Sequence, residues 1–253
     1  MGHVISVINQ KGGVGKTTTA VNLSAFLAGK GYKTLLVDED SQGNATSGLF
    51  MDRSQFSQTL YDVLINGVPA ETAVYKTGVE RLSLLPSSID LAGAEIEMVQ
   101  MKKRETLLRR KIKPLKENFD FIIIDCPPSL GLMTVNALTA ASQVLIPIQA
   151  EFFALEGLTQ LVQTIETVSD GLNPSLTILG ILLTMFDGRT NLAMQVAGEV
   201  KEYFGDKVFH TVIPRSIRLS EAPSFGEPIA VYAPKSKGAV AYQSLCEEVL
   251  QRV

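Results

Sequence analysis

Cysteine is scarce in this 253-residue sequence, which contains only Cys126 and Cys246. The two residues lie far apart, and neither belongs to a Cys-x-x-Cys pair. This spacing excludes a disulfide framework and a structural zinc site of the usual kind. The composition is therefore typical of a protein of the reducing cytoplasm.

Uncharged stretches long enough to cross a membrane are also lacking, with one exception. Residues 126–150 form a run of 25 residues without charge, but Pro127, Pro128 and Pro147 interrupt it. We therefore predict a buried helix followed by a buried strand there. The first residues carry no basic region of the kind that begins a signal peptide, so we expect no export.

A strong net charge is the third missing feature. The net charge of −3 and the pI near 5.5 do not indicate a basic nucleic-acid-binding surface. Positive charge is instead concentrated in residues 102–117, where eight basic and two acidic side chains give +6 and leave −9 for the remainder. A solvated helix face explains this run most simply. Whether the run contacts DNA stays open.

What the sequence does contain is a regular alternation of apolar, β-branched runs with helical patterns such as residues 17–28 and 155–168. This alternation predicts one α/β domain over residues 1–253, with a mostly parallel sheet and helices on both faces. Residues 46–80 are less regular, and we expect loops and a short helix there. The predicted strands are residues 4–8, 34–38, 82–86, 121–125, 144–148, 178–184 and 208–213.

The first predicted strand leads into QKGGVGKTTTA (residues 10–20), and a helical pattern follows. This order aims backbone N–H groups and the positive end of a helix dipole at one point, which is an anion site. Glycines let the backbone curl around phosphate oxygens, Lys16 can reach the β- and γ-phosphates, and Thr17 can ligate Mg²⁺. We predict a P-loop NTPase fold that binds ATP or ADP with Mg²⁺ through Lys11, Gly12, Gly13, Val14, Gly15, Lys16, Thr17 and Thr18.

The loop departs from the general P-loop pattern, because Gln10 stands where that pattern has a glycine and Lys11 opens the loop. KGGVGKT resembles the deviant Walker A motif of the ParA/Soj and MinD group of ATPases. In that group the first lysine reaches across a dimer interface to the partner's nucleotide. The resemblance implies that Lys16 binds ATP in its own subunit, while Lys11 acts on the other subunit of an ATP-dependent homodimer. Without this resemblance, Lys11 would be interpreted equally well as a solvated lysine of the loop.

Carboxylates follow two of the predicted strands. FIIID places Asp125 at the C-terminal end of a strand, where α/β proteins bind ligands and a carboxylate can hold Mg²⁺. TLLVDEDSQGNAT ends another strand with Asp38 and Asp40, which on their own would be explained as strand terminators. This segment resembles the family's VDLDPQGNAT, which implies that Asp40 orients the hydrolytic water. The expected catalytic residues are Lys11, Lys16 and Asp40, and the expected metal ligands are Thr17, Asp38 and Asp125.

Two residues beside Asp40 depart from the family pattern. Glu39 stands where an apolar residue is usual, and Ser41 stands where proline is usual. We expect an extra negative charge and a looser turn at this point. Cys126 raises the alternative of the nitrogenase iron protein, which shares the deviant loop and binds an iron–sulfur cluster. That cluster takes two cysteines per chain, so we expect Cys126 to be a packed residue instead.

Residues 211–229, TVIPRSIRLSEAPSFGEPI, resemble the ParA/Soj segment that contacts adenine and ribose, which implies that Pro214 and Ser216 line the nucleotide site. Asparagine is common in the family at the position of Ser216. The family's ATP-bound dimer binds DNA without sequence preference, and Arg189 and Arg218 match two arginines that serve this purpose. Such phosphate contacts are sensitive to salt. Taken alone, each arginine would be read as a surface charge.

The resemblance extends over nearly the whole chain. It implies a chromosome- or plasmid-partitioning ATPase with weak intrinsic activity, whose ATP-bound homodimer binds double-stranded DNA on the nucleoid. A ParB-like centromere-binding protein would stimulate hydrolysis. The C-terminal residues do not form a basic amphipathic pattern, so we expect no membrane attachment. The alternatives are a MinD-like membrane-cycling positioning ATPase and a metabolic or electron-transfer enzyme.

Overall fold

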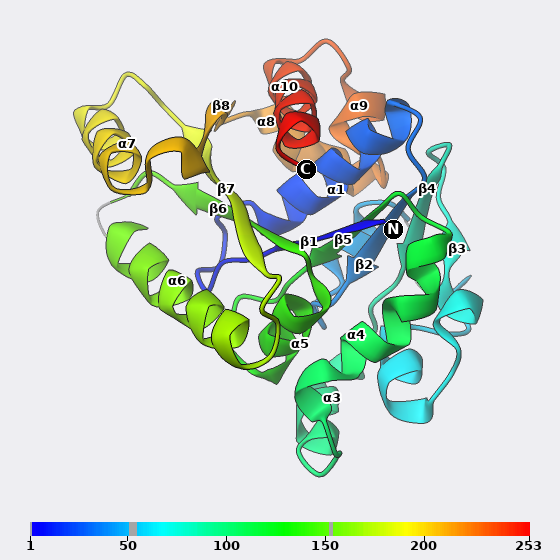
Figure 1. Cartoon of the computed structure of the whole chain (residues 1–253). Coiled ribbons are helices and arrows are strands. Elements are labelled where there is room, and N and C mark those ends of the chain that lie inside the picture. The colour runs from blue at the N-terminus through cyan, green and yellow to red at the C-terminus, as the bar shows by residue number, and fades with distance from the viewer. Residues whose placement is uncertain (1, 51–54, 152–153) are drawn as a thin grey trace.

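Eight strands form one sheet in the computed structural model, which describes residues 2–50, 55–151 and 154–253 (Figure 1). The strand order is β3-β4-β2-β5-β1-β6-β7-β8, and only the β3–β4 pair is antiparallel. The mostly parallel α/β sheet is thus confirmed. The strands are β1 (His3–Val7), β2 (Thr34–Asp38), β3 (Tyr75–Lys76), β4 (Leu82–Leu85), β5 (Phe121–Asp125), β6 (Gln143–Gln149), β7 (Thr177–Phe186) and β8 (Val208–Pro214).

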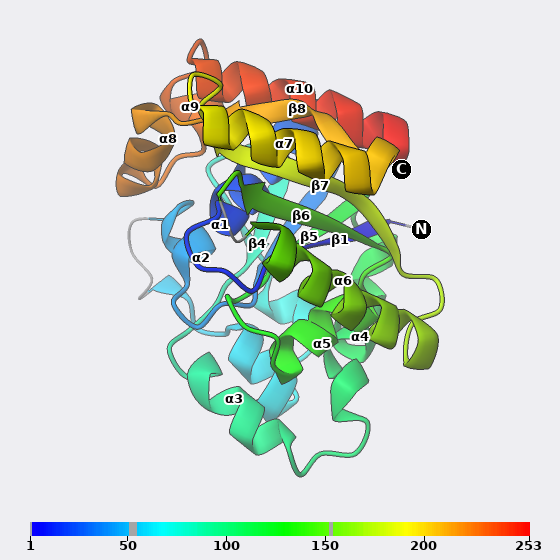
Figure 2. The ribbon, with the colours of Figure 1, turned by 90° about the vertical axis from the view of Figure 1, so that its left-hand side faces the viewer.

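Helices cover both faces of the sheet (Figures 1 and 2). In β5, the side chains of Ile122 and Ile124 join the core under α3 to α7, while Phe121 and Ile123 join the core under α1 and α8 to α10. The helices are α1 (Lys16–Gly29), α2 (Asn44–Ser47), α3 (Leu91–Met98), α4 (Leu107–Ile112), α5 (Leu132–Ala140), α6 (Ala154–Gly171), α7 (Asn191–Phe204), α8 (Ile217–Glu221), α9 (Ile229–Tyr232) and α10 (Lys237–Arg252).

All seven predicted strands are present within a few residues of their expected bounds, and the uncharged segment 126–150 forms α5 and β6. β3 was missed because a two-residue strand is too short to show an alternating pattern. The irregular segment 46–80 contains the end of α2, a π-helix at Asp62–Asn66 and a 3₁₀ turn at Ala70–Ala73. Residues 51–54 lie outside the described residues.

The two edge strands of the sheet, β3 and β8, differ from the buried strands in how their outer backbone is protected. β3 is only two residues long, and its Lys76 is exposed. On β8, the Glu248 carboxylate of α10 accepts hydrogen bonds from the backbone N–H groups of His210 (2.8 Å) and Thr211 (3.0 Å). Arg252, also on α10, donates to the carbonyl of Val208 at 3.1 Å. Side chains of α10 therefore occupy backbone groups of this edge strand.

Candidate nucleotide-binding site

The loop between β1 and α1 has the backbone of an anion site. Gly13 (φ 74°) and Gly15 (φ 87°) both adopt the left-handed conformation that glycine accepts most easily. α1 then begins at Lys16 with no side-chain cap and no acidic residue in its first turn. The first N–H groups of a helix have no intrahelical partners, so those of α1 are left for a ligand at the positive end of the helix dipole.

A cavity of about 600 Å³ opens beside this loop, a volume that suits a nucleotide-sized ligand. Its walls come from the P-loop, the loop after β2, and the segment that joins β8 to α8. Most of the residues expected at the nucleotide are thereby brought together. The expected residues that line the cavity are Gly12, Gly13, Gly15, Lys16, Thr17, Thr18, Asp40, Pro214 and Ser216.

Lys16 lies on the inner side of the loop. Its side chain is largely buried, and its Nζ donates a hydrogen bond to the carbonyl oxygen of Lys11 at 2.9 Å. Burial lowers the pKa of Lys16 below its usual value, and the charge of Asp125 opposes that shift. The ammonium group therefore sits within the loop that would surround a phosphate.

Lys11 lies on the outer side of the same loop and does not line the main cavity. Its side chain is about half exposed (51%), and its ammonium group forms an ion pair with Glu151, just after β6. Lys11 also borders a separate cavity of about 270 Å³, together with Gln10 and residues of α6. Within this subunit, the first lysine is turned away from the nucleotide cavity.

Asp125, at the end of β5, is fully buried, and neither of its carboxylate oxygens has a hydrogen-bond partner among the described residues. Burial raises its pKa well above the usual value and the Asp38 charge adds to the effect, while Thr17 and Lys16 favour the charged form. A buried carboxylate without partners fits a place for a cation.

No group of three or more histidine, cysteine or acidic residues in the described part of the chain surrounds one point that could hold a metal. Mg²⁺ does not need such a group, since it usually combines one or two protein ligands with waters and substrate phosphates. Asp125 and the hydroxyl of Thr17, which lines the cavity, provide oxygen atoms of the required kind. The residues present therefore fit a magnesium ion that arrives with a nucleotide.

Asp38, the neighbour of Asp125 across β2 and β5, is already engaged. Its Oδ2 accepts hydrogen bonds from the backbone N–H and the hydroxyl of Thr46, both at 2.7 Å, and its Oδ1 accepts one from the N–H of Asp40 at 3.3 Å. Burial raises the pKa of Asp38 to about 6. These contacts make Asp38 the anchor of the loop that carries Asp40.

Asp40 is held at the cavity wall by that loop. Its carbonyl accepts a hydrogen bond from the Ser87 hydroxyl at 2.6 Å, and its Oδ1 accepts one from the N–H of Gln42 at 3.0 Å. The carboxylate is nearly buried (8% exposed) but lines the cavity. A fixed carboxylate at this point is able to orient a water molecule.

Glu39 is not an extra surface charge. The side chain is buried, and both of its carboxylate oxygens lack a hydrogen-bond partner among the described residues. Burial raises its pKa well above the usual value, and the charges of Glu95 and Asp125 act in the same direction. Burial therefore works against the negative charge expected at this position. Ser41 is partly exposed in the turn that follows.

Cys126 and Cys246 are both free and buried in the structure. Cys126 follows β5, whereas Cys246 lies within α10. They join the two opposite cores of the sheet. Burial raises the pKa of both thiols, to about 11 for Cys246. Each cysteine thus packs in a hydrophobic core, as was expected for Cys126.

Arg189 and Arg218 both lie outside the cavity, in neighbouring parts of the fold. Arg189 follows β7 and Arg218 lies in α8 after β8, and these two strands pair through Phe186 and Pro214. Both guanidinium groups are exposed, at 89% and 61%. Each pairs with a nearby acid, Arg189 with Asp187 at 2.6 Å and Arg218 with Glu221 at 2.9 Å. Exposed pairs of this kind are weak, so they leave the arginines available.

Several functional contacts escaped the sequence analysis. The hydroxyl of Thr184, on β7, donates to the carbonyl of Val14 at 2.7 Å and so clamps the P-loop from behind. Met185 follows with a left-handed backbone (φ 48°) and lines the cavity, as do Arg215 and Tyr242. Of these, only Arg215 had a signal in the sequence, because it stands between Pro214 and Ser216.

Comparisons with known proteins agree with this geometry. A family model described as an AAA domain matches residues 2–178. The sporulation initiation inhibitor protein Soj of Bacillus subtilis (strain 168) is 55% identical over 249 residues, which make up 98% of this chain and 98% of that protein. The chain belongs to the Soj/ParA family. The resemblance inferred from KGGVGKT is thereby confirmed.

Two further relatives extend the comparison. The chromosome partitioning protein ParA of Myxococcus xanthus (strain DK1622) is 52% identical over 252 residues, covering 100% of this chain and 89% of that protein. A crystal structure of cobyrinic acid a,c-diamide synthase from Mycobacterium smegmatis, with bound ADP and magnesium, is 39% identical, with a TM-score of 0.87. It covers 99% of this chain and 95% of that one. The Soj/ParA fold therefore accounts for nearly the whole chain.

Proposed function

We propose that this chain is a partitioning ATPase of the Soj/ParA family, which binds ATP or ADP with Mg²⁺ and hydrolyses ATP as a homodimer on nucleoid DNA. Curated relatives with names of this kind match it over nearly its whole length. The observation that carries the proposal is the placement of two lysines on opposite sides of one loop. Lys16 lies in the cavity, while Lys11 points outward.

Each group of the site has a task in ATP hydrolysis, which requires positioning and charge neutralisation more than covalent chemistry. The P-loop N–H groups and Lys16 hold the phosphates, and Asp40 orients the attacking water. When bound, Mg²⁺ would neutralise phosphate charge. Thr17 and Asp125 would hold it, while Asp38 keeps the Asp40 loop in place through Thr46.

Lys11 completes the site only in a dimer. Within its own subunit it does not line the nucleotide cavity, and its partner Glu151 holds it at the surface. A second subunit that faces this surface would receive the ammonium group at its nucleotide. ATP then joins the two subunits, and its hydrolysis separates them.

DNA binding is assigned to the surface that carries Arg189 and Arg218, with a ParB-like protein as the activator of hydrolysis. None of the described helices is both long and apolar enough to cross a membrane. The test is binding to arbitrary-sequence duplex DNA with ATP, ADP and no nucleotide, for the chain and its Arg189→Ala/Arg218→Ala variant. ATP-dependent, salt-sensitive binding that the variant loses is expected. If an ATP-bound dimer forms and yet binds no DNA, the DNA role is wrong.

A further inference from the structure

The surface around α3 exposes apolar side chains that the nucleotide site does not use. Ile96 (77% exposed) in α3 and Val99 (56%) at its C-terminal end are three residues apart and share one face of the helix, and Ile89 (70%) is exposed in the turn before it. The opposite face, with Leu91, Ala94 and Met98, is buried in the core. Helix α3 forms one end of the molecule in Figures 1 and 2, on the side opposite α7 and α8.

Positive charge borders this apolar face. Lys102, Lys103 and Arg110 are exposed, and the ammonium groups of the two lysines form no ion pair or hydrogen bond with any residue in the described ranges. Lys103 has a left-handed backbone (φ 57°), which is unusual for a residue other than glycine. We call Ile89, Ile96, Val99, Lys102, Lys103 and Arg110 the α3–α4 surface.

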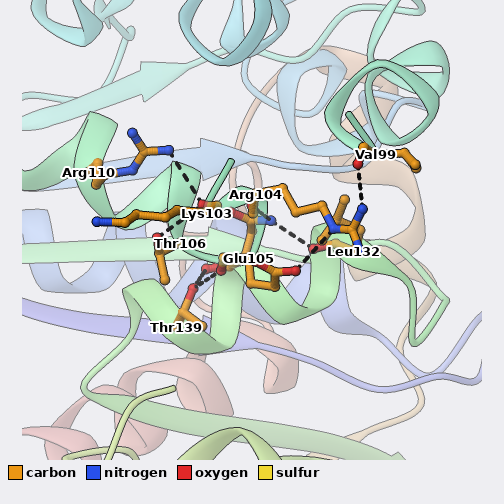
Figure 3. Close-up of polar contacts among 9 residues, drawn as sticks. Val99, Lys103, Arg104, Glu105, Thr106, Arg110, Leu132 and Thr139 are labelled. Atoms are coloured by element: carbon orange, nitrogen blue, oxygen red, sulfur yellow. Dashed lines mark hydrogen bonds and ion pairs between the residues drawn. The ribbon is translucent and has the colours of Figure 1, made fainter. Parts of the chain in front are cut away.

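The turn that carries these lysines is held rigidly. Figure 3 shows the hydrogen bonds that converge on the carbonyl oxygen of Lys103, from the Thr106 hydroxyl at 3.1 Å and from Arg110 at 3.4 Å. The N–H of Thr106 also donates to it at 3.1 Å. Arg104 reaches back to the carbonyl of Val99 and pairs with Glu105. The exposed side chains are therefore presented from a fixed backbone.

The same turn is fastened to α5. The Thr139 hydroxyl donates to the carbonyl of Glu105 at 2.6 Å (Figure 3). Asn136 donates to the carbonyl of Arg104 at 2.9 Å and accepts a hydrogen bond from the N–H of Leu108 at 3.0 Å. From α3 itself, Glu95 accepts a hydrogen bond from the N–H of Met133 at 3.0 Å, in the first turn of α5. Helix α5 begins where the loop after Asp125 ends, at residues 126–131.

We propose that the α3–α4 surface docks an acidic, amphipathic segment of a partner protein, and that docking acts on the loop 126–131 through Glu95 and α5. A helix with apolar residues on one face and flanking Asp and Glu side chains would match both the apolar stripe and the bordering charge. The contacts of Glu95, Asn136 and Thr139 then link the occupied surface to the loop beside the nucleotide. The effect of docking on the loop 126–131 rests on the proposed function, whereas docking itself does not.

Charge and position favour a protein over a polyanion. Asp90 and Glu97 lie within the same exposed segment as Ile89 and Ile96, so DNA or an anionic lipid surface would place negative charge against them, whereas an amphipathic helix can carry its acidic residues only beside Lys102, Lys103 and Arg110. A protein partner tolerates such mixed charge. Helices α7 and α8 lie at the opposite end of the molecule in both views. The arginines assigned to DNA belong to that part of the chain, since Arg189 precedes α7 and Arg218 lies in α8.

The test uses the full chain with ADP and a fluorescent model helix of about 18 residues, long enough to form helix when bound, with leucines on one face and glutamates beside them. We expect saturable binding that weakens roughly tenfold in Lys102→Glu/Lys103→Glu/Arg110→Glu. The matched control, Lys76→Glu/Lys207→Glu/Lys235→Glu, makes the same charge change at exposed lysines elsewhere and should bind as the parent does. Ile96→Ser/Val99→Ser should weaken binding to a similar degree.

Three outcomes would overturn the docking proposal. The first is equal binding of the model helix by the α3–α4 variant and the control variant. The second is loss of duplex DNA binding in the α3–α4 variant but not in the control, and the third is loss of binding to vesicles with anionic lipid in the α3–α4 variant but not in the control.

The coupling between the docking surface and the loop is measured by amide hydrogen exchange, which should slow in residues 126–135 when the helix binds. Unchanged exchange there would overturn the coupling. Since the assay needs neither ATP hydrolysis nor DNA, its failure is distinct from failure of the proposed function.

Discussion

The two sides of the P-loop differ in almost every physical respect, although only a few residues separate them. The inner side has the buried Lys16, a large cavity and the buried carboxylate of Asp125, which has no hydrogen-bond partner among the described residues. The outer side has the half-exposed Lys11, an ion pair with Glu151 and a smaller cavity. The inner side is built to bind a ligand within one subunit. On the outer side, Lys11 already has an ion-pair partner in the monomer. That ion pair has to break before Lys11 can reach the nucleotide of a second subunit.

Replacement of Lys16 gives the largest expected effect, because it removes the cation of the inner side. Lys16→Ala should weaken binding of ADP with Mg²⁺ roughly 100-fold, as expected when a buried charge-assisted contact to phosphate is lost. Isothermal titration calorimetry measures this directly. Affinity within a few-fold of the parent would mean that the main cavity is not the phosphate site.

Replacement of Lys11 should separate the two sides. Lys11→Ala should keep ADP affinity within about threefold, since the side chain lies outside the main cavity, but should lower ATP turnover roughly 100-fold by removing a stabilising charge from the partner's site. Analytical ultracentrifugation with ATP should show loss of the dimer. A variant that still dimerises and hydrolyses ATP normally would contradict a role for Lys11 across the interface.

Nucleotide binding should depend on pH through the inner side alone. The pKa of Asp38 is raised from 3.8 to about 6, and that of Asp125 is raised as well. Protonation of Asp38 removes negative charge beside Asp125, so affinity for ADP with Mg²⁺ should fall as the pH drops from about 7.5 to 5.5, by up to roughly fourfold from Asp38. Lys11→Ala should show the same profile. A flat profile in the parent would show that these groups are charged before the metal binds.

The stability of the ligand-free fold should change with pH in the opposite direction. Because the folded pKa of Asp38 lies above its usual value of 3.8, the folded chain holds more protons than the unfolded chain between those two values. The contribution of Asp38 to stability therefore declines as pH rises from about 4 to about 6. Asp38→Asn should flatten this part of a profile of urea midpoint against pH.

The smallest effect is expected from the partner of Lys11. Glu151→Gln removes an ion pair whose side chains are 51% and 40% exposed, and such pairs contribute about 0.2–1 kcal/mol. The ATP-dependent dimer should therefore become slightly more stable, by no more than about fivefold in its dissociation constant. Sedimentation at several protein concentrations measures the shift. A weaker dimer would indicate that Glu151 serves the interface rather than competing with it.

The inner side could be predicted from sequence because its chemistry is local. Strand, glycine turn, Lys16 and helix are consecutive in the chain, and Asp125 follows an unmistakable buried strand. Other contacts could not be predicted, because they depend on how separate segments of the chain meet in the fold. They are the contacts of Asp38 with Thr46, of Thr184 with Val14 and of Lys11 with Glu151. The raised pKa of Glu39 could not be foreseen either, because burial in the fold rather than residue type causes it.

Both edges of the sheet are blocked against strand addition. On one side the two-residue β3 with its exposed Lys76 offers too short a template, and on the other Glu248 and Arg252 occupy backbone groups of β8. Open edges are where sheets from separate molecules join into aggregates. On the proposed function, many copies of this protein gather on one DNA molecule and meet each other constantly. Closed sheet edges would then leave the proposed nucleotide-dependent dimer as the route by which the copies associate.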